Sequence, residues 1–313
     1  MSSGEPVRVA IVGAGRMGRT HLAVLVGSTE VRATAVVEPV EAVRDELAAS
    51  GIRAFAGLEE LIAAGGVDAV VIAAPTDLHA ELVAQVAAAG LPVLCEKPCG
   101  LRPEETAEAM RAAAEAGVVL QIGYWRRFVP ELVALREQVV GGEFGELSVI
   151  SCWQWDAQPP PSSFRARSGG ILLDMGVHEF DQIRWLTGRE IDDVHALAAT
   201  AMWDAPVAGD PESVVALARL SGGAVATVSL GRRFPHGDCC WLELMGTDGY
   251  ARRTFMWGDD GLRVFHDALV AQADAFAAAV RGAAQQGATG EDALRAIEAA
   301  DRAAQTLAVG VRG

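Results

Sequence analysis

A glycine-rich turn near the N-terminus limits the folds open to this chain more than any other feature. Residues 13–18 read G-x-G-x-x-G, and they directly follow the apolar run at residues 7–12. A short apolar run that ends in glycine is typical of a buried parallel strand, and a helix is expected from Met17 to about Val26. This order predicts the first βαβ unit of a dinucleotide-binding domain, with the pyrophosphate at the helix N-terminus.

The residue after the second predicted strand indicates which dinucleotide is bound. That strand covers residues 31–37 and is followed by Glu38. A carboxylate there accepts hydrogen bonds from the adenosine ribose and repels a 2′-phosphate, so NAD is expected rather than NADP. Two other readings stay open: Arg16 can accept a phosphate, and the glycine turn can be purely structural. The cofactor contacts expected in this region are Gly13, Gly15, Arg16, Met17, Gly18 and Glu38.

Strands and helices alternate up to residue 123. Further strands are expected at residues 68–74, 92–95 and 118–122, and helices at residues 78–89 and 103–116. Such alternation predicts a doubly wound parallel sheet, and therefore an α/β Rossmann domain over residues 1–123.

The pattern changes after residue 123. Helices are expected near residues 130–140 and 171–186, a strand near 147–155, several short strands between 194 and 255, and Ala-rich helices at 266–281 and 291–307. Strands in succession predict an open, mainly antiparallel sheet with helices on one face. Residues 124–313 are therefore expected to form an α+β domain that binds substrate and makes an oligomer.

Lys97 follows the strand expected at residues 92–95 and lies between Glu96 and Pro98. This is the carboxyl edge of the sheet, where open α/β sheets bind ligands. The position alone leaves two readings open, a surface turn or a cation at an active site.

Asp174 and His178 lie four residues apart in an apolar segment, and so share one face of a predicted helix. An unpaired charge there would be costly, whereas a histidine oriented by a carboxylate is a suitable general base near neutral pH. The alternative is a core histidine whose hydrogen bond is satisfied by the aspartate.

These motifs together resemble the glucose-fructose oxidoreductase/inositol dehydrogenase/rhizopine catabolism (Gfo/Idh/MocA) family. The resemblance runs from about Val7 to Leu307, in the glycine turn, residues 75–79, residues 96–98 and the segment from Asp174 to His178. Residues 124–128, 181–188 and 289–292 are most similar to inositol 2-dehydrogenases.

The resemblance implies an NAD-dependent dehydrogenase that oxidises a secondary alcohol of a cyclic polyol or sugar. In its catalytic set, His178 takes the hydroxyl proton, Asp174 orients His178, and Lys97 stabilises the oxyanion or shares the proton transfer. The three side chains are expected to converge beside the nicotinamide. An NADPH-dependent sugar ketone reductase and a non-catalytic NAD-binding sensor are the alternatives. The resemblance also implies cofactor contacts at Ala74, Pro75, Thr76, His79 and Glu96, a substrate contact at Arg126, and often a cis bond before Pro98.

Trp153 and Trp155 mark a departure from the inositol dehydrogenases, which often carry a His and an Asn in this neighbourhood. The two rings share one face of the predicted strand at residues 147–155. They can stack on a sugar ring, or they can pack at a subunit contact. The departure puts myo-inositol in doubt as the substrate, though not the reaction class.

Composition excludes several kinds of partner. A net charge of −15 disfavours nucleic acid and anionic membranes. No stretch approaches 18 apolar residues, so no transmembrane helix is expected. Residues 1–6 lack a basic and an apolar region, so no secretory signal is expected, and a cytoplasmic location follows.

The open sheet face predicts a homo-oligomer, a tetramer or a dimer.

The five cysteines suggest no disulfide framework. Cys239 and Cys240 follow His236 and Asp238, which leaves a metal site conceivable. Adjacent cysteines in a strand point to opposite faces, however, so buried thiols are the favoured reading and no metal is expected.

Overall fold

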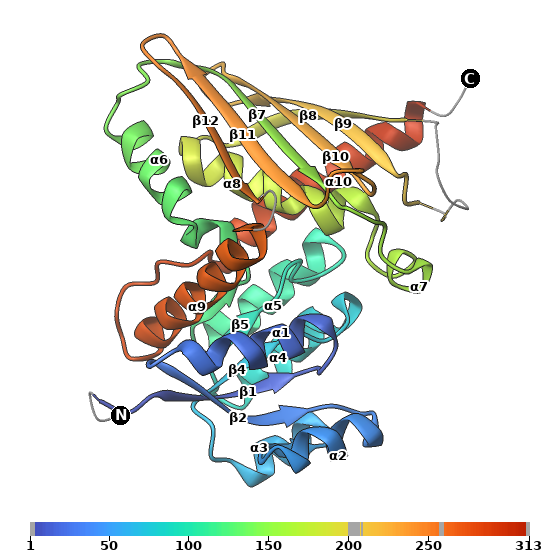
Figure 1. Ribbon diagram of the computed structural model, residues 1–313, viewed down its shortest axis with the longest axis vertical. Coiled ribbons are helices and arrows are strands. Elements are labelled where there is room, and N and C mark those ends of the chain that lie inside the picture. The colour runs from blue at the N-terminus through green and yellow to red at the C-terminus, as the bar shows by residue number, and fades with distance from the viewer. Residues whose placement is uncertain (1–3, 200–206, 208, 257–259, 311–313) are drawn as a thin grey trace. The chain divides into compact units, whose positions relative to one another are not determined.

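The computed structural model describes residues 4–199, 207, 209–256 and 260–310, and the chain divides into two compact units (Figure 1). The first unit comprises Met1–Gly100, Glu104–Tyr124 and Leu269–Ala293, and the second comprises Leu101–Pro103, Trp125–Ala268 and Leu294–Gly313. Each unit is built around its own sheet.

The first unit contains a parallel sheet that confirms the predicted Rossmann architecture. Its order among the described strands is β3-β2-β1-β4-β5-β6, so the direction of winding reverses between β1 and β4. Ligands bind at such a switch point, outside the carboxyl ends of the strands. The strands are β1 (Val7–Val12), β2 (Val31–Val37), β3 (Arg53–Phe55), β4 (Ala69–Ile72), β5 (Val93–Cys95) and β6 (Leu120–Ile122).

Helices follow the strands of this sheet in the expected alternation. They are α1 (Arg16–Val24), α2 (Glu41–Ala49), α3 (Leu58–Ala64), α4 (His79–Ala88) and α5 (Pro103–Ala116), with 3₁₀ turns η1 (Leu25–Gly27) and η2 (Thr76–Leu78). Every residue of β4 is buried, which requires that both faces of the sheet be covered. The short elements α2, β3 and α3 extend the alternation beyond the segments expected from sequence.

A late segment of the chain returns to the first unit. Leu269–Ala293 groups with it, and the Ile122 N–H donates to the Ala288 carbonyl at 2.9 Å. Arg281 also forms an ion pair with Glu30 at 2.7 Å. The expected division at residue 123 does not include this return, because its contacts join residues more than 150 positions apart.

The second unit contains a mixed, mostly antiparallel sheet, as expected. Its order among the described strands is β12-β11-β7-β10-β9-β8, with β7 and β10 parallel and the other pairs antiparallel. The strands are β7 (Leu147–Trp155), β8 (Ile191–Ala198), β9 (Ser213–Leu220), β10 (Val225–Gly231), β11 (Cys239–Gly246) and β12 (Tyr250–Met256).

Helices pack on one face of this second sheet. Figure 1 shows α6 (Pro130–Val140) and α8 (Val177–Thr187) on the same side of it. Thr306 and Arg302 of α10 (Gly290–Gly310) hydrogen-bond to β8 on that sheet. Further helical segments of this unit are α7 (Ser162–Arg165) and the 3₁₀ turn η3 (Trp125–Phe128), whereas α9 (Gly261–Val280) begins in this unit and continues into the first.

The opposite face, here called the open face, carries exposed apolar side chains. In β9 the buried and exposed residues alternate strictly, with Val215 and Leu217 51% and 61% exposed. The open face is formed by Leu197 of β8, Val215 and Leu217 of β9, Val225 of β10, Trp153 of β7 and Met245 of β11.

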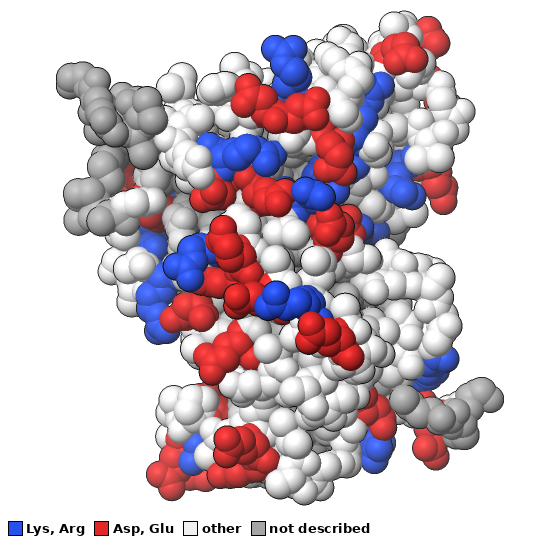
Figure 2. Space-filling view, turned by 180° about the vertical axis from the view of Figure 1, so that it is seen from behind, with Lys and Arg blue, Asp and Glu red and all other residues white. Residues whose placement is uncertain are grey.

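The charged surface gives no sign of a basic binding site on the face drawn in Figure 2. Lys and Arg lie among Asp and Glu there and do not gather into a continuous patch. Among the described residues, no helix is both long and apolar enough to cross a membrane.

Candidate active site

The glycine turn has the geometry of a dinucleotide-binding loop. Gly13 has φ +92°, and a Cβ there would lie 2.7 Å from the Ala74 Cα. A Cβ on Gly18 would overlap the carbonyl oxygen of Gly13, so α1 packs directly on the end of β1. Gly15 differs, since nothing lies within 4 Å of its Cβ position. Two glycines therefore serve packing, and Gly15 leaves open space above the N-terminus of α1, as a bound pyrophosphate requires.

Glu38 lies beside this turn, at the end of β2. Its Oε2 accepts a hydrogen bond from the Ala14 N–H at 2.9 Å, and its Oε1 accepts one from the Val40 N–H at 3.0 Å. The carboxylate is thus fixed next to the loop. Arg16 is exposed and Met17 half-buried.

The turn that carries Lys97 is fixed by buried side chains. Glu96 Oε1 lies 2.7 Å from His21 Nε2 of α1, and Glu96 Oε2 accepts a bond from the Lys97 N–H at 3.3 Å. His79 lies 2.7 Å from the Pro98 carbonyl and 2.8 Å from that of Ala74. The Lys97–Pro98 bond is cis. Pro75 is exposed and Thr76 half-buried, at the start of η2 beside this turn.

Two of these buried groups have shifted pKa values. Burial acts to raise the pKa of Glu96, but the hydrogen bond and charge of His21 outweigh it, so the pKa lies below its usual value. Burial lowers the pKa of His79. Glu96 therefore supports the Lys97 turn from beneath, a role that sequence reasoning did not assign to it. Sequence reasoning did not identify His21 as a functional residue. The one sequence signal for it is that a histidine stands among the residues of α1 that face the sheet.

Asp174 and His178 lie on consecutive turns, as predicted, but the first turn is not α-helical. Leu172–Gly176 forms a π-turn, and α8 begins at Val177. Gly169 and Gly170 precede it with φ +78° and +85°. His178 is 6% exposed, and its ring packs edge-on against Trp125 at 6.5 Å between centroids.

Asp174 has a partner that the sequence did not reveal. The guanidinium of Arg232, which directly follows β10, donates from Nη1 to Asp174 Oδ2 at 2.5 Å. Asp174 is half-buried, whereas Arg232 is fully buried. A buried cation therefore lies against the carboxylate that was expected to orient His178.

Arg126 lies in a buried ion pair. Its Nη1 donates to Glu179 Oε1 at 2.5 Å, and its Nη2 donates to Gln154 Oε1 at 2.8 Å. Burial raises the pKa of Glu179, and the charge of Arg126 opposes that rise. These contacts give Arg126 a role in fixing α8 to β7, and its expected contact with substrate stays a prediction.

Trp153 and Trp155 both lie on the open face. The Trp153 ring stacks on Trp241 at 4.9 Å with 10° between the planes. Trp155 Nε1 donates to Ser229 Oγ at 3.1 Å. Packing within the sheet thus accounts for one face of Trp153, and stacking of either ring on a sugar stays a prediction.

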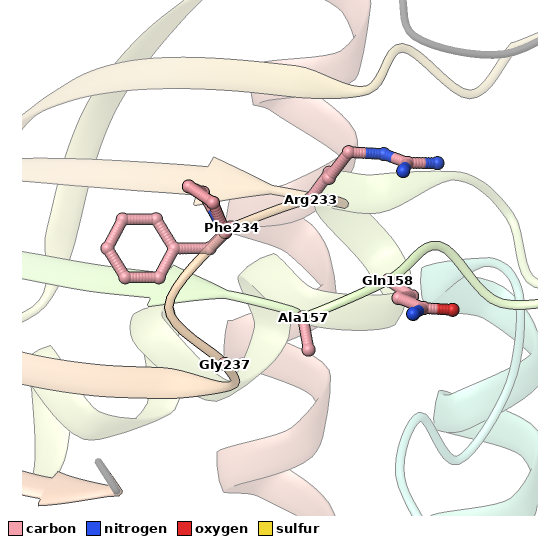
Figure 3. Close-up of a pocket in the computed structure, with 6 residues that line it drawn as sticks. Ala157, Gln158, Arg233, Phe234 and Gly237 are labelled. Carbon is pink, nitrogen blue, oxygen red and sulfur yellow. The ribbon is translucent and has the colours of Figure 1, made fainter.

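A pocket of about 420 Å³ opens beyond the ends of β7 and β10 (Figure 3). Figure 3 shows the Arg233 and Gln158 side chains extending toward the same side of the view and the Phe234 ring pointing the opposite way. None of the predicted catalytic residues is among its lining, which consists of Ala157, Gln158, Arg233, Phe234, Pro235 and Gly237.

The cysteines are buried free thiols. Burial raises the pKa of Cys239 to about 11. Within the described ranges, no three His, Cys, Asp or Glu side chains gather closely enough to hold a metal ion.

Comparison with known proteins accounts for both units. Residues 7–124 match the family model "Oxidoreductase family, NAD-binding Rossmann fold", and residues 132–252 match "GFO/IDH/MocA C-terminal domain". The chain is 48% identical to the rhizopine catabolism protein MocA of Rhizobium meliloti, over 96% of this chain and 95% of that protein. It is 31% identical to an inositol 2-dehydrogenase of Rhizobium meliloti (strain 1021), over 96% and 97%.

A solved structure is similar over nearly the whole chain. It is the scyllo-inositol dehydrogenase of Lactobacillus casei with bound NAD(H) and scyllo-inositol. It has a TM-score of 0.88 and 27% identity, and the match covers 97% of this chain and 98% of that one.

The different surroundings of Gly18 and Gly15 predict separable effects of the same substitution. Gly18→Ala should lower the free energy of unfolding by about 1–3 kcal/mol, because the added methyl forces α1 away from Gly13. Gly15→Ala should change it by less than about 0.5 kcal/mol, yet weaken NAD binding roughly tenfold or more, because the methyl fills the space above the loop. Chemical denaturation and calorimetric titration with NAD measure the two effects. Unchanged NAD affinity in Gly15→Ala would contradict the assignment of the loop.

Proposed function

This chain belongs to the Gfo/Idh/MocA oxidoreductase family, and we propose that it is an NAD-dependent dehydrogenase that oxidises a secondary alcohol of a cyclic polyol or sugar. The observation that carries the proposal is that one chain, matched in both halves by this family, combines the dinucleotide loop with Lys97, Asp174 and His178. A binding protein without catalysis would have no need of all three side chains.

The residues around the glycine turn fit the adenosine half of NAD. Gly15 leaves the backbone open to a pyrophosphate, and Glu38 is fixed where it can accept bonds from ribose hydroxyls. The same carboxylate repels a 2′-phosphate, which weighs against the NADPH-dependent alternative. When bound, NAD accepts the hydride that leaves the carbinol carbon. Met17, Pro75 and Thr76 are the further cofactor contacts that we propose, and His79 supports them through its contacts with the Pro98 and Ala74 carbonyls.

The proton of the oxidised hydroxyl passes to the imidazole of His178 in this proposal. Asp174 orients that ring and stabilises its charged form, and the ammonium group of Lys97 stabilises the alkoxide that develops as the proton leaves. Lys97 depends in turn on Glu96, whose carboxylate accepts the Lys97 N–H and is itself held by His21. His21 and Glu96 are thus positioning residues.

Two features limit which compounds are candidate substrates. The rhizopine catabolism protein is the more similar of the two relatives described, at 48% against 31% identity for the inositol 2-dehydrogenase. Trp153 and Trp155 take up space in the neighbourhood where, by the family resemblance, inositol dehydrogenases often carry a His and an Asn. The substrate class is therefore a cyclic polyol or sugar, with rhizopine and inositols as the first compounds to test.

We also propose that the protein works as a homo-oligomer, a tetramer or a dimer, in the cytoplasm, where the NAD pool lies. The open face supports the first part. It exposes Leu197, Leu217 and Val225 on adjacent strands, and contiguous apolar surface of this kind marks an interaction site.

The proposed function is tested by steady-state kinetics on the purified protein. NAD reduction should be observed with at least one compound among rhizopine, myo-inositol, scyllo-inositol and aldoses. The kcat/KM should be about tenfold or more higher with NAD than with NADP, because Glu38 opposes the 2′-phosphate. Glu38→Ala serves as the control and should lower the ratio of kcat/KM with NAD to kcat/KM with NADP. A preference for NADP, or no turnover with any of these compounds, would contradict the proposal.

His178→Ala should lower kcat by roughly 10²–10⁴-fold, the usual effect of losing a general base, with little change in NAD affinity. Turnover, NAD titration and melting temperature are measured on one preparation. His195→Ala is the matched control, because His195 is an exposed histidine of β8, and it should retain normal turnover. If His178 only packs in the core, its variant will melt earlier while the folded enzyme keeps its rate.

Leu217→Glu should dissociate the oligomer, because it places a charge in the middle of the apolar open face. Leu262→Glu is the matched control, since Leu262 is equally exposed at 62% but lies on α9, away from that face. Sedimentation velocity at micromolar concentration measures the masses of both variants. A monomeric wild-type protein, or a Leu217→Glu variant of unchanged mass, would refute the proposed interface.

A further inference from the structure

A chain of buried opposite charges runs through the second unit and ends at Asp174. Arg232 donates from Nη1 to Asp174 Oδ2 at 2.5 Å and from Nη2 to Asp210 Oδ1 at 3.0 Å. Asp210 in turn accepts from Arg165 at its Oδ2, at 2.5 Å, and at its carbonyl, at 3.0 Å. Charges thus alternate from Arg165 to Asp174, and Arg232 is the link that touches the proposed catalytic machinery.

Arg232 is held as a cation. Its side chain is fully buried, and burial acts to lower its pKa, but the carboxylates of Asp174 and Asp210 outweigh that effect and the pKa is raised. Asp156 adds a third carboxylate at 4.0 Å. A guanidinium in these surroundings presents a rigid fork whose two Nη atoms fix two carboxylates at once.

The backbone of Arg232 is also fixed by its neighbours. Its N–H donates to the Glu212 carbonyl at 2.8 Å, a bond that fixes the backbone of Arg232 independently of Arg165. The backbone makes a second link between the same segments: a Cβ on Gly170 would lie 2.6 Å from the Gly209 carbonyl. The loop with Asp210 is therefore packed against a glycine that precedes the π-turn of Asp174.

We propose that Arg232 is a positioning residue for the dehydrogenase reaction, one that holds the Asp174 carboxylate in a single orientation toward His178. The inference rests on the proposed function, in which Asp174 orients the histidine. Arg232 is itself fixed by its bonds to Asp210 and Glu212, so the carboxylate that it binds is held by residues from outside the helical segment of His178.

The test compares Arg232→Met with Arg165→Met. Both remove a buried guanidinium from the same network, but Arg165 binds Asp210, and its loss leaves the direct bond from Arg232 to Asp174 in place. Arg232→Met should lower kcat by roughly 10–100-fold, as expected when a reacting group is misplaced, with NAD affinity within about twofold of wild type. Arg165→Met should keep kcat within about threefold of wild type, even if its melting temperature falls by as much as that of Arg232→Met. Arg232→Lys, which restores the charge, should recover part of the lost kcat.

A second readout does not depend on turnover. The ¹⁵N shifts of the His178 ring report its tautomer and hydrogen bonding, and Arg232→Met should change them while Arg165→Met leaves them as in wild type. Equal losses of kcat in the two Met variants, or unchanged His178 shifts in Arg232→Met, would overturn the inference. A wild-type protein that oxidises no polyol would instead refute the proposed function, and the His178 shifts would still decide whether Arg232 positions Asp174.

Discussion

The close approach of α1 to β1 is the constraint on which the rest of the first unit depends. It exists because Gly13 and Gly18 have no side chains, so that the helix can lie against the turn that begins it. The approach leaves the loop open above Gly15. It also sets His21, on the same helix, against Glu96 at the end of β5. One packing contact thus shapes both the cofactor loop and the support beneath Lys97.

Local patterns were enough to predict the alternating architecture and the glycine loop, because apolar runs and glycine positions are properties of short segments. They left Lys97 and His178 with a structural reading as well, and only the family resemblance singled out Lys97, Asp174 and His178 as a catalytic set, which stays a prediction. The features that were missed join distant residues. His21 and Glu96 are 75 positions apart, and Arg232 and Asp174 are 58 apart. No short-range pattern encodes such pairs, because the two residues come into contact only when the chain has folded and segments far apart in the sequence lie side by side.

The π-turn illustrates a different limit. Its sequence, Leu172 to Gly176, has the apolar spacing of an ordinary helix, and a continuous helix was expected there. The two glycines before it, with positive φ, and the contact of Gly170 with Gly209 set the direction in which the chain enters. Tertiary packing thus decided the local geometry. The ion pairs of Arg126 with Glu179 and of Arg127 with Asp181 then hold the first half of α8. Each pair is nearly dry, so its geometry must be good for it to be tolerated.

The return of Leu269–Ala293 to the first unit bears on how the protein is made. On the ribosome, β1 to β6 emerge early, yet the partner of the Ile122 N–H emerges only after the second sheet has been synthesised. Domains usually fold as units, with the N-terminal one first. Here the Ile122 N–H of β6 lacks its partner, the Ala288 carbonyl, until more than 100 further residues have been synthesised. The order of folding is therefore nested rather than sequential: the second unit can mature inside the interval during which the first remains unfinished.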